Sequence, residues 1–188
     1  DPNIQYIGRI ENSDPTCIVF TYPGVQIRTG FTGTSLDMMC KMGSGYFMAE
    51  IDGGAPTKVS FLNNTIVELA HGLTDGTHQV IVTYIGEGYE TLPEFHGFFV
   101  DKGKTLVPAT NVPTRKIEFI GNSITCGYCI EANSEAEHYE EKTANFYHTY
   151  AARTARNLNA QALVVARSGI GVYRSYNGPR TGDKVNMN

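Results

Sequence analysis

Three short stretches of the chain place a serine beside small residues, an arrangement in which a hydroxyl can act as a nucleophile. They are GTSL at 33–36, GNSIT at 121–125 and RSGIG at 167–171. A serine at the carboxyl end of a buried strand lies where free backbone N–H groups can bind a developing oxyanion. None of the three is the G-x-S-x-G turn of the α/β-hydrolases, because Thr125 stands in place of the second glycine in GNSIT.

GNSIT and RSGIG each adjoin an apolar segment typical of a strand, KIEFIG at 116–121 and QALVVARSG at 161–169. Parallel neighbouring strands end at the same edge of a sheet, so these two corners are expected side by side. Ser123 could then attack a carbonyl whose oxyanion accepts from the N–H groups of Ser123 and Gly169. From the residues alone, a nucleophile and a polar turn residue both fit Ser123. GTSL has no helix nearby, which favours a structural corner.

A serine nucleophile needs a base, and the chain offers the histidines His71, His78, His96, His138 and His148. The first three fall in a strand-rich region where packing or solvent-facing roles are expected, and the last lies on a predicted helix. His138, in an acidic loop after GNSIT, is the candidate nearest the pocket. We expect the base outside this set, in sequence after Asn188.

Cys126 and Cys129 have the CxxC spacing of redox and metal sites. A zinc site would need a second pair of ligands, and the sequence has neither another CxxC nor a histidine pair at ligand spacing. We therefore interpret them as small thiols packed beside a turn, and predict neither a metal nor an organic cofactor.

Residues 1–107 are predicted to form a β-sandwich, because short alternating segments are separated by turn-forming residues. The expected strands are 4–10, 17–22, 25–32, 46–52, 57–62, 66–70, 78–85 and 95–101. Residues 108–115, with two prolines, read as a linker.

Residues 116–188 read as the start of an α/β domain. A helix is predicted over 142–160 with Thr143 as its N-cap. Its buried stripe is expected to comprise Ala144, Tyr147, Ala151, Ala155 and Leu158. Two strands and one helix cannot cover both faces of a parallel sheet. We therefore expect the rest of the domain to come from further sequence or from a second polypeptide.

IEFIGNSITCGY, ARSGIGVYRSYNGP and YPGVQIRTGFTGTSLDMM together resemble family 2 carbohydrate esterases, which are SGNH (GDSL) hydrolases. The resemblance implies an N-terminal jelly-roll followed by a flavodoxin-like three-layer α/β/α domain, incomplete here. It also implies an acetyl xylan esterase activity, with Ser123 as nucleophile and the N–H groups of Ser123 and Gly169 as oxyanion donors. Asn122 replaces the family's usual aspartate and is expected to order the turn. The family's further oxyanion asparagine and its Asp-x-x-His block would fall after Asn188, so this chain alone is expected to be inactive.

An acetylated polysaccharide is the expected substrate, with Tyr173 and Arg174 flanking the sugar. A non-catalytic carbohydrate-binding protein with a degenerate hydrolase domain is the alternative. A lipase or thioesterase would require a more apolar loop than YRSYNGPR. The formal net charge of -4 and the lack of a basic run give no support for a nucleic-acid partner, and no apolar run is long enough to span a membrane. We expect a secreted or periplasmic protein.

Overall fold

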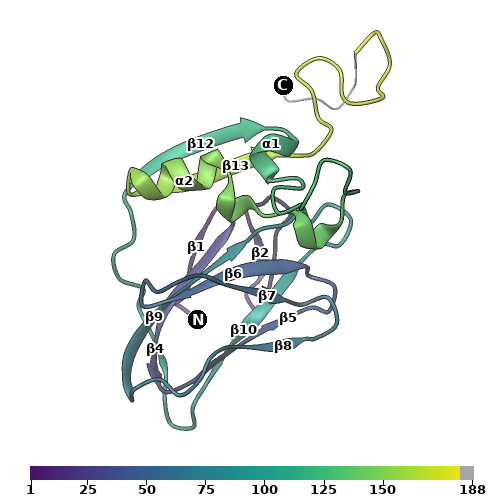
Figure 1. The fold of residues 1–188 in the computed structure, drawn as a ribbon. Helices are drawn as coiled ribbons and strands as arrows, with labels where there is room; N and C mark the ends of the chain where they lie inside the picture. The colour runs from purple at the N-terminus through teal and green to yellow at the C-terminus, as the bar shows by residue number, and fades with distance from the viewer. Residues whose placement is uncertain (183–188) are drawn as a thin grey trace.

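The computed structural model describes residues 1–182. Two antiparallel sheets face each other, and a smaller unit of two strands and two α-helices lies across one side of them (Figure 1). The first sheet, in spatial order, contains β1 (Gln5–Ile7), β4 (Gln26–Gly33), β9 (Gly76–Tyr84), β6 (Tyr46–Ile51) and β7 (Thr57–Ser60), with β11 (Leu106–Val107) also pairing with β4. The second contains β2 (Glu11–Asp14), β3 (Cys17–Val19), β10 (Glu94–Val100), β5 (Leu36–Cys40) and β8 (Ile66–Ala70).

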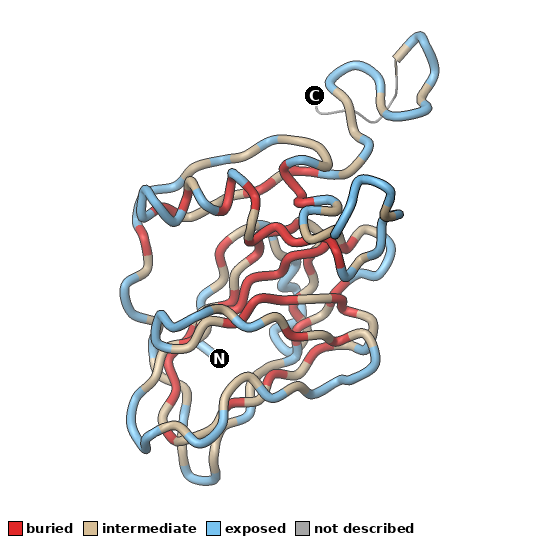
Figure 2. The backbone as a smooth tube through the Cα atoms, viewed as in Figure 1, coloured by how far each residue is buried: buried red, intermediate tan, exposed pale blue. Residues whose placement is uncertain are grey.

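Alternation of side chains along the strands builds the core between these sheets. In β9, Val80, Val82 and Tyr84 are at most 1% exposed. They pack in one cluster with aromatic residues of the same sheet and with residues of the facing sheet such as Met38 and Phe95. Figure 2 shows the buried segments running along the strands of both sheets. The chain is therefore mostly β-structure, organised as a sandwich.

All eight strands predicted in this region are present, although several are shorter than expected. Three strands were not predicted, namely β2, β5 and β11. β5 alternates as a core strand should, with Leu36, Met38 and Cys40 fully buried. The segment from 108 to 114 contains no helix or strand and joins the sandwich to the second unit.

The second unit contains the parallel pair β12 (Arg115–Gly121) and β13 (Ala160–Ala166). One face of this pair packs on α2 (Tyr150–Asn157) and on the sandwich, through residues such as Val164 and Ala166. The other face is not covered by described residues, and Ile120 is 56% exposed there. The strand predicted from KIEFIG is therefore present as β12, and within 1–182 only one of its faces has a neighbour.

The helix predicted over 142–160 is also wrong in its extent. Two short 3₁₀ turns, η1 (Glu141–Thr143) and η2 (Phe146–His148), precede α2, whose N-cap is Thr149 rather than Thr143. The backbone between them turns toward the sandwich, where Phe146 N donates to Ile85 O at 3.1 Å. Tertiary contact therefore overrides helix propensity before residue 150. Leu158 falls outside the helix, is 48% exposed, and does not belong to the buried stripe.

A second hydrophobic cluster joins the two units. Met48 and Ile85 of the sandwich pack with Phe146, Val164 and other buried residues of the α/β unit, all at most 8% exposed. The two units thus share a continuous apolar interface. No helix within the described residues has the length and apolar character needed to cross a membrane.

Candidate active site

The two serine corners at the ends of β12 and β13 lie next to each other. Gly121 pairs with Ala166 in the last registered position of the strands, and Arg167 N donates to Gly121 O at 3.3 Å just beyond it. An open hollow of about 570 Å³ occupies this edge of the sheet. It is lined by Asn122, Ser123, Tyr128, Ser168, Gly169, Ile170, Arg174 and Tyr176. The structure thus brings Ser123 and Gly169 into the wall of one solvent-accessible space.

Ser123 is the first residue of α1 (Ser123–Cys126), a single helical turn that follows β12 directly. Asn122 is the N-cap, and its side-chain oxygen accepts from Ile124 N at 3.1 Å. The turn ends at Gly127, whose φ of 85° lies in the left-handed region and whose position leaves no space for a Cβ against the Asn145 carbonyl. The expectation that Asn122 orders this turn is confirmed.

Two residues that line the hollow, Ser123 and Gly169, have backbone N–H groups without a partner among the described residues. The structure shows no described residue accepting a hydrogen bond from Ser123 N, from Ser123 Oγ or from Gly169 N. Gly169 has a φ of 79°, a conformation that favours glycine, and its carbonyl accepts from Tyr176 N at 2.7 Å. Unpaired N–H groups next to a nucleophilic hydroxyl are the donors that a tetrahedral oxyanion requires.

A carboxylate of the sandwich holds the second corner in place. Glu87, in the loop between β9 and β10, accepts from Ser168 N at 2.7 Å through one oxygen and from Ser168 Oγ through the other. Tyr89 of the same loop donates to the carbonyl of Ala166, and its ring lies 5.0 Å from the guanidinium of Arg167. Neither Glu87 nor Tyr89 could be predicted from the sequence, because nothing in the β-rich half indicates a contact with a corner some eighty residues away.

Aromatic side chains surround the hollow. Tyr128 stacks on Tyr139 with ring centroids 4.3 Å apart, and both rings are partly exposed. Tyr176 is 83% exposed and Arg174 is held by a bond from its Nε to Gly178 O at 2.8 Å. Tyr173, by contrast, is 63% exposed and is not among the described lining residues. The described part of the chain after β13, up to residue 182, extends away from the body of the molecule (Figure 1).

No histidine, aspartate or glutamate is among the described residues that line the hollow. His138 is exposed in its loop, and His148 lies 3.6 Å from Glu131. The two thiols of the CxxC sequence differ: Cys126 is buried in the interface cluster, whereas Cys129 is half-buried. Burial, together with the Glu87 carboxylate, raises the pKa of the Cys126 thiol, which keeps it protonated and unreactive.

Comparison with known proteins identifies the family. Residues 6–109 match the sequence profile described as carbohydrate esterase 2 N-terminal. The cellulase/esterase CelE of Acetivibrio thermocellus is 39% identical over 181 residues, which are 95% of this chain and 22% of that protein. An acetylxylan esterase/glucomannan deacetylase of Cellvibrio japonicus is 33% identical over 186 residues, 95% of this chain and 50% of that protein.

Among solved structures, a family two carbohydrate esterase from Clostridium thermocellum in complex with cellohexaose superposes with a TM-score of 0.83. It is 37% identical, and the superposition covers 93% of this chain and 54% of that one. The chain thus spans about half, or less, of the length of these relatives. The family predicted from the three resembling stretches is confirmed: the chain belongs to the family 2 carbohydrate esterases.

Proposed function

We propose that this chain is part of a carbohydrate O-acetyl esterase that removes acetyl groups from xylan or a related plant polysaccharide. The observation that carries the proposal is the shared hollow, whose lining includes both Ser123 and Gly169. Membership of the esterase family and the naming of a relative as an acetylxylan esterase support it. We propose that the domain architecture is a jelly-roll joined to an SGNH-type, flavodoxin-like α/β/α domain, and that residues 116–188 form one portion of the second domain. Residues 183–188 of that portion lie outside the described structure.

In the proposed reaction, Ser123 Oγ attacks the carbonyl carbon of an acetyl ester while a base takes the hydroxyl proton. The resulting oxyanion accepts hydrogen bonds from the N–H groups of Ser123 and Gly169, each worth about 3–4 kcal/mol of transition-state stabilisation. Collapse of this intermediate breaks the bond to the sugar oxygen, which takes the proton and leaves. Water, deprotonated by the same base, then attacks the acetyl-serine and releases acetate.

The base is proposed to come from sequence beyond the 188 residues. The described lining of the hollow holds no side chain that could take the proton, and an unassisted serine hydroxyl is a weak nucleophile at neutral pH. Arg174 and the partly exposed tyrosines Tyr128 and Tyr176 are proposed to contact the sugar, through guanidinium donors and aromatic faces. Tyr173 is retained as a proposed sugar contact. Because the substrate is extracellular plant polysaccharide, we propose a secreted or periplasmic location.

The test uses a polypeptide that extends this chain past Asn188, assayed for acetate release from acetylated xylan. Ser123→Ala is expected to lower the rate by about a thousandfold or more, as for other serine nucleophiles. Ser134→Ala, in an exposed loop, is the control and is expected to retain full activity. The 188-residue chain alone is expected to show no Ser123-dependent hydrolysis of 4-nitrophenyl acetate. Undiminished acetate release by the Ser123→Ala protein would refute the assignment of the nucleophile.

A carbohydrate-binding role without catalysis is the second candidate. The exposed stack of Tyr128 on Tyr139 beside a hollow that lacks a described base is what favours it. In that case the extended polypeptide would release no acetate, yet the 188-residue chain would bind xylo- or cello-oligosaccharides in calorimetry. Tyr128→Ala would weaken that binding, whereas Ser123→Ala would leave it unchanged.

A further inference from the structure

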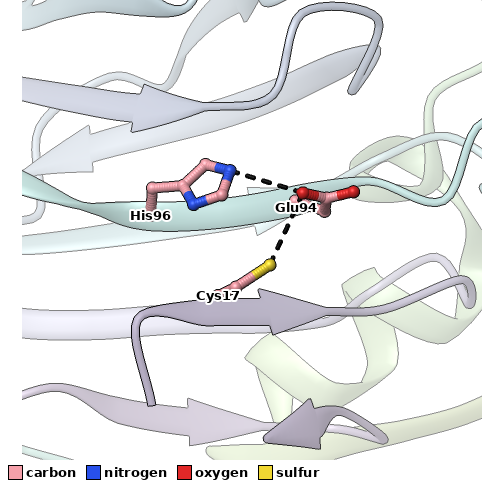
Figure 3. Close-up of side chains that lie close together, drawn as sticks. All are labelled: Cys17, Glu94 and His96. Carbon is pink, nitrogen blue, oxygen red and sulfur yellow. Dashed lines mark hydrogen bonds and ion pairs between the residues drawn. The ribbon is translucent and has the colours of Figure 1, made fainter. Parts of the chain in front are cut away.

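A cluster of three side chains with metal-binding chemistry lies on the outer face of the sandwich, away from the residues that line the hollow. Cys17 belongs to β3, and Glu94 and His96 belong to the adjacent antiparallel strand β10 (Figure 3). Phe95 pairs with Ile18, and both point into the core at 2% and 4% exposure. Because side chains alternate along a strand, their neighbours Cys17, Glu94 and His96 share the opposite face.

The spacing of the three ligand atoms fits a tetrahedral ion. Glu94 Oε2 lies 3.5 Å from Cys17 Sγ and 3.4 Å from His96 Nε2, and all three atoms lie within 4.8 Å of one another. Zinc binds sulfur at about 2.3 Å and nitrogen or oxygen at about 2.0–2.1 Å, so its tetrahedral ligands stand about 3.4–3.6 Å apart. The two contacts of Glu94 already have that separation, and only the thiol and the imidazole would need to approach.

Outer contacts hold two of these side chains in the orientation that a metal requires. His96 Nδ1 is 3.3 Å from Thr16 O, so that nitrogen donates to the carbonyl and leaves the Nε2 lone pair toward the cluster. Lys41 Nζ bonds to the other carboxylate oxygen of Glu94 at 2.8 Å and to Leu92 O at 2.5 Å. Glu94 therefore keeps Oε2 free for a single bond to an ion. Ligating histidines and carboxylates in metalloproteins have such second partners.

A divalent cation would balance the negative charge of the side chains in and beside the cluster. The carboxylate of Glu94 lies 3.5 Å from Cys17 Sγ, and Asp14 pairs with Cys17 across β2 and β3. Binding zinc would displace the thiol proton. The thiolate, Glu94 and Asp14 would then bring three negative charges, which one zinc ion and the Lys41 ammonium neutralise.

We propose that Cys17, Glu94 and His96 form a zinc site that joins β3 to β10, with water completing the coordination. β3 is held to the sheet by β10 on one side and carries the edge strand β2, whose residues are all exposed. The ion would therefore anchor the outer margin of this sheet in the folded protein. Zinc here is structural, and the proposal is independent of the esterase reaction and of the hollow.

The experiment titrates the reduced, metal-free 188-residue chain with Co²⁺ followed by optical spectroscopy, and with Zn²⁺ in calorimetry. We expect one ion per chain, a thiolate-to-cobalt charge-transfer band, and zinc binding tighter than about 1 µM. Cys17→Ser should abolish the charge-transfer band and weaken zinc binding at least tenfold, and His96→Gln should also weaken zinc binding at least tenfold while keeping the band.

Matched controls use a thiol and an imidazole outside the cluster. Cys129→Ser removes another half-buried thiol, and His71→Gln removes an exposed histidine that also lies beside a glutamate, Glu68. Both are expected to bind zinc as the unmodified chain does. The far-ultraviolet circular dichroism of each metal-free variant establishes that the sandwich is folded. Binding only at millimolar zinc, or a cobalt spectrum that survives Cys17→Ser and disappears with Cys129→Ser, would overturn the proposal.

Discussion

Replacing Glu87 by alanine should release the corner that carries Gly169 while leaving the sandwich folded. Both carboxylate oxygens of Glu87 bond to Ser168, at the backbone N–H and at the hydroxyl. A hydrogen bond to a charged group contributes about 1.5–3 kcal/mol. Because both residues are only half-buried, the pair is expected near the lower end, at about 2–3 kcal/mol for the two bonds together.

That energy sets the expected exchange rate of the Ser168 amide. A loss of about 2–3 kcal/mol corresponds to a rise of about 30- to 160-fold in the population of the open corner. Hydrogen–deuterium exchange measured by NMR should accordingly accelerate by about that factor at Ser168 in Glu87→Ala. Glu87→Gln keeps one acceptor oxygen and should give an intermediate rate.

Two controls separate this effect from general destabilisation. Glu90→Ala removes an exposed carboxylate from the same loop and should leave exchange at Ser168 unchanged. The amide of Val82, in the centre of β9, should keep its protection in every variant if the sandwich stays folded. A Ser168 amide that exchanges at the unmodified rate in Glu87→Ala would show that the carboxylate does not hold the corner.

Three further substitutions test the interface and the ionisable groups. Gly24→Ala places a methyl group 2.7 Å from the Phe146 ring at a φ of 82°, whereas its control Gly43→Ala has a similar φ of 87° and no atom within 4 Å of the added methyl group. Urea unfolding should show that Gly24→Ala lowers the free energy of unfolding by about 1–3 kcal/mol more than Gly43→Ala does. Equal losses in the two variants would contradict the packing of Gly24 against Phe146. Burial raises the pKa of Glu141 above 4.5, so the ionised carboxylate destabilises the folded protein at neutral pH. Glu141→Gln should therefore raise the free energy of unfolding at pH 7. The gain should vanish below pH 4.5, where the carboxyl is protonated in both the folded and the unfolded state. Hydrogen bonds from Ser35 and then Thr34 lower the pKa of Asp101 from 3.8 to about 2, so the stabilisation is complete above pH 3.8 and is lost as the pH falls through about 2. Asp101→Asn should therefore unfold more easily than the unmodified protein at pH 7 and equally easily below pH 2. A difference that persists below pH 2 would argue against this origin.

Local patterning was sufficient to predict the strands and the two corners, because alternation of apolar residues and turn residues are properties of neighbouring positions. β5 has the same alternation, in Leu36, Met38 and Cys40, but it was not predicted because it directly follows GTSL, which was interpreted as a corner. The start of α2 could not be predicted in the same way. Phe146 N bonds to Ile85 O, a contact between distant segments that decides where the helix begins.

The same limit applies to the candidate sites. The neighbouring positions of Ser123 and Gly169 could be predicted, because each residue follows its own strand and parallel strands end at the same edge of a sheet. Glu87 could not, because its partner Ser168 is 81 residues away in the sequence. The cluster of Cys17, Glu94 and His96 was not predicted either, since it depends on the register of β3 against β10. Contacts across strands become visible only after folding.

The loop at 85–89 has a consequence for protein engineering. Ile85 bonds to Phe146, and Glu87 and Tyr89 bond to Ser168 and Ala166 at the end of β13, so one short connection of the sandwich orients the α/β unit through two of its segments. The sandwich is thus unsuited to replacement by an unrelated carrier module. A chimaera that fuses residues 116–188 to a foreign scaffold would forfeit these anchors, unless the loop were transplanted with them.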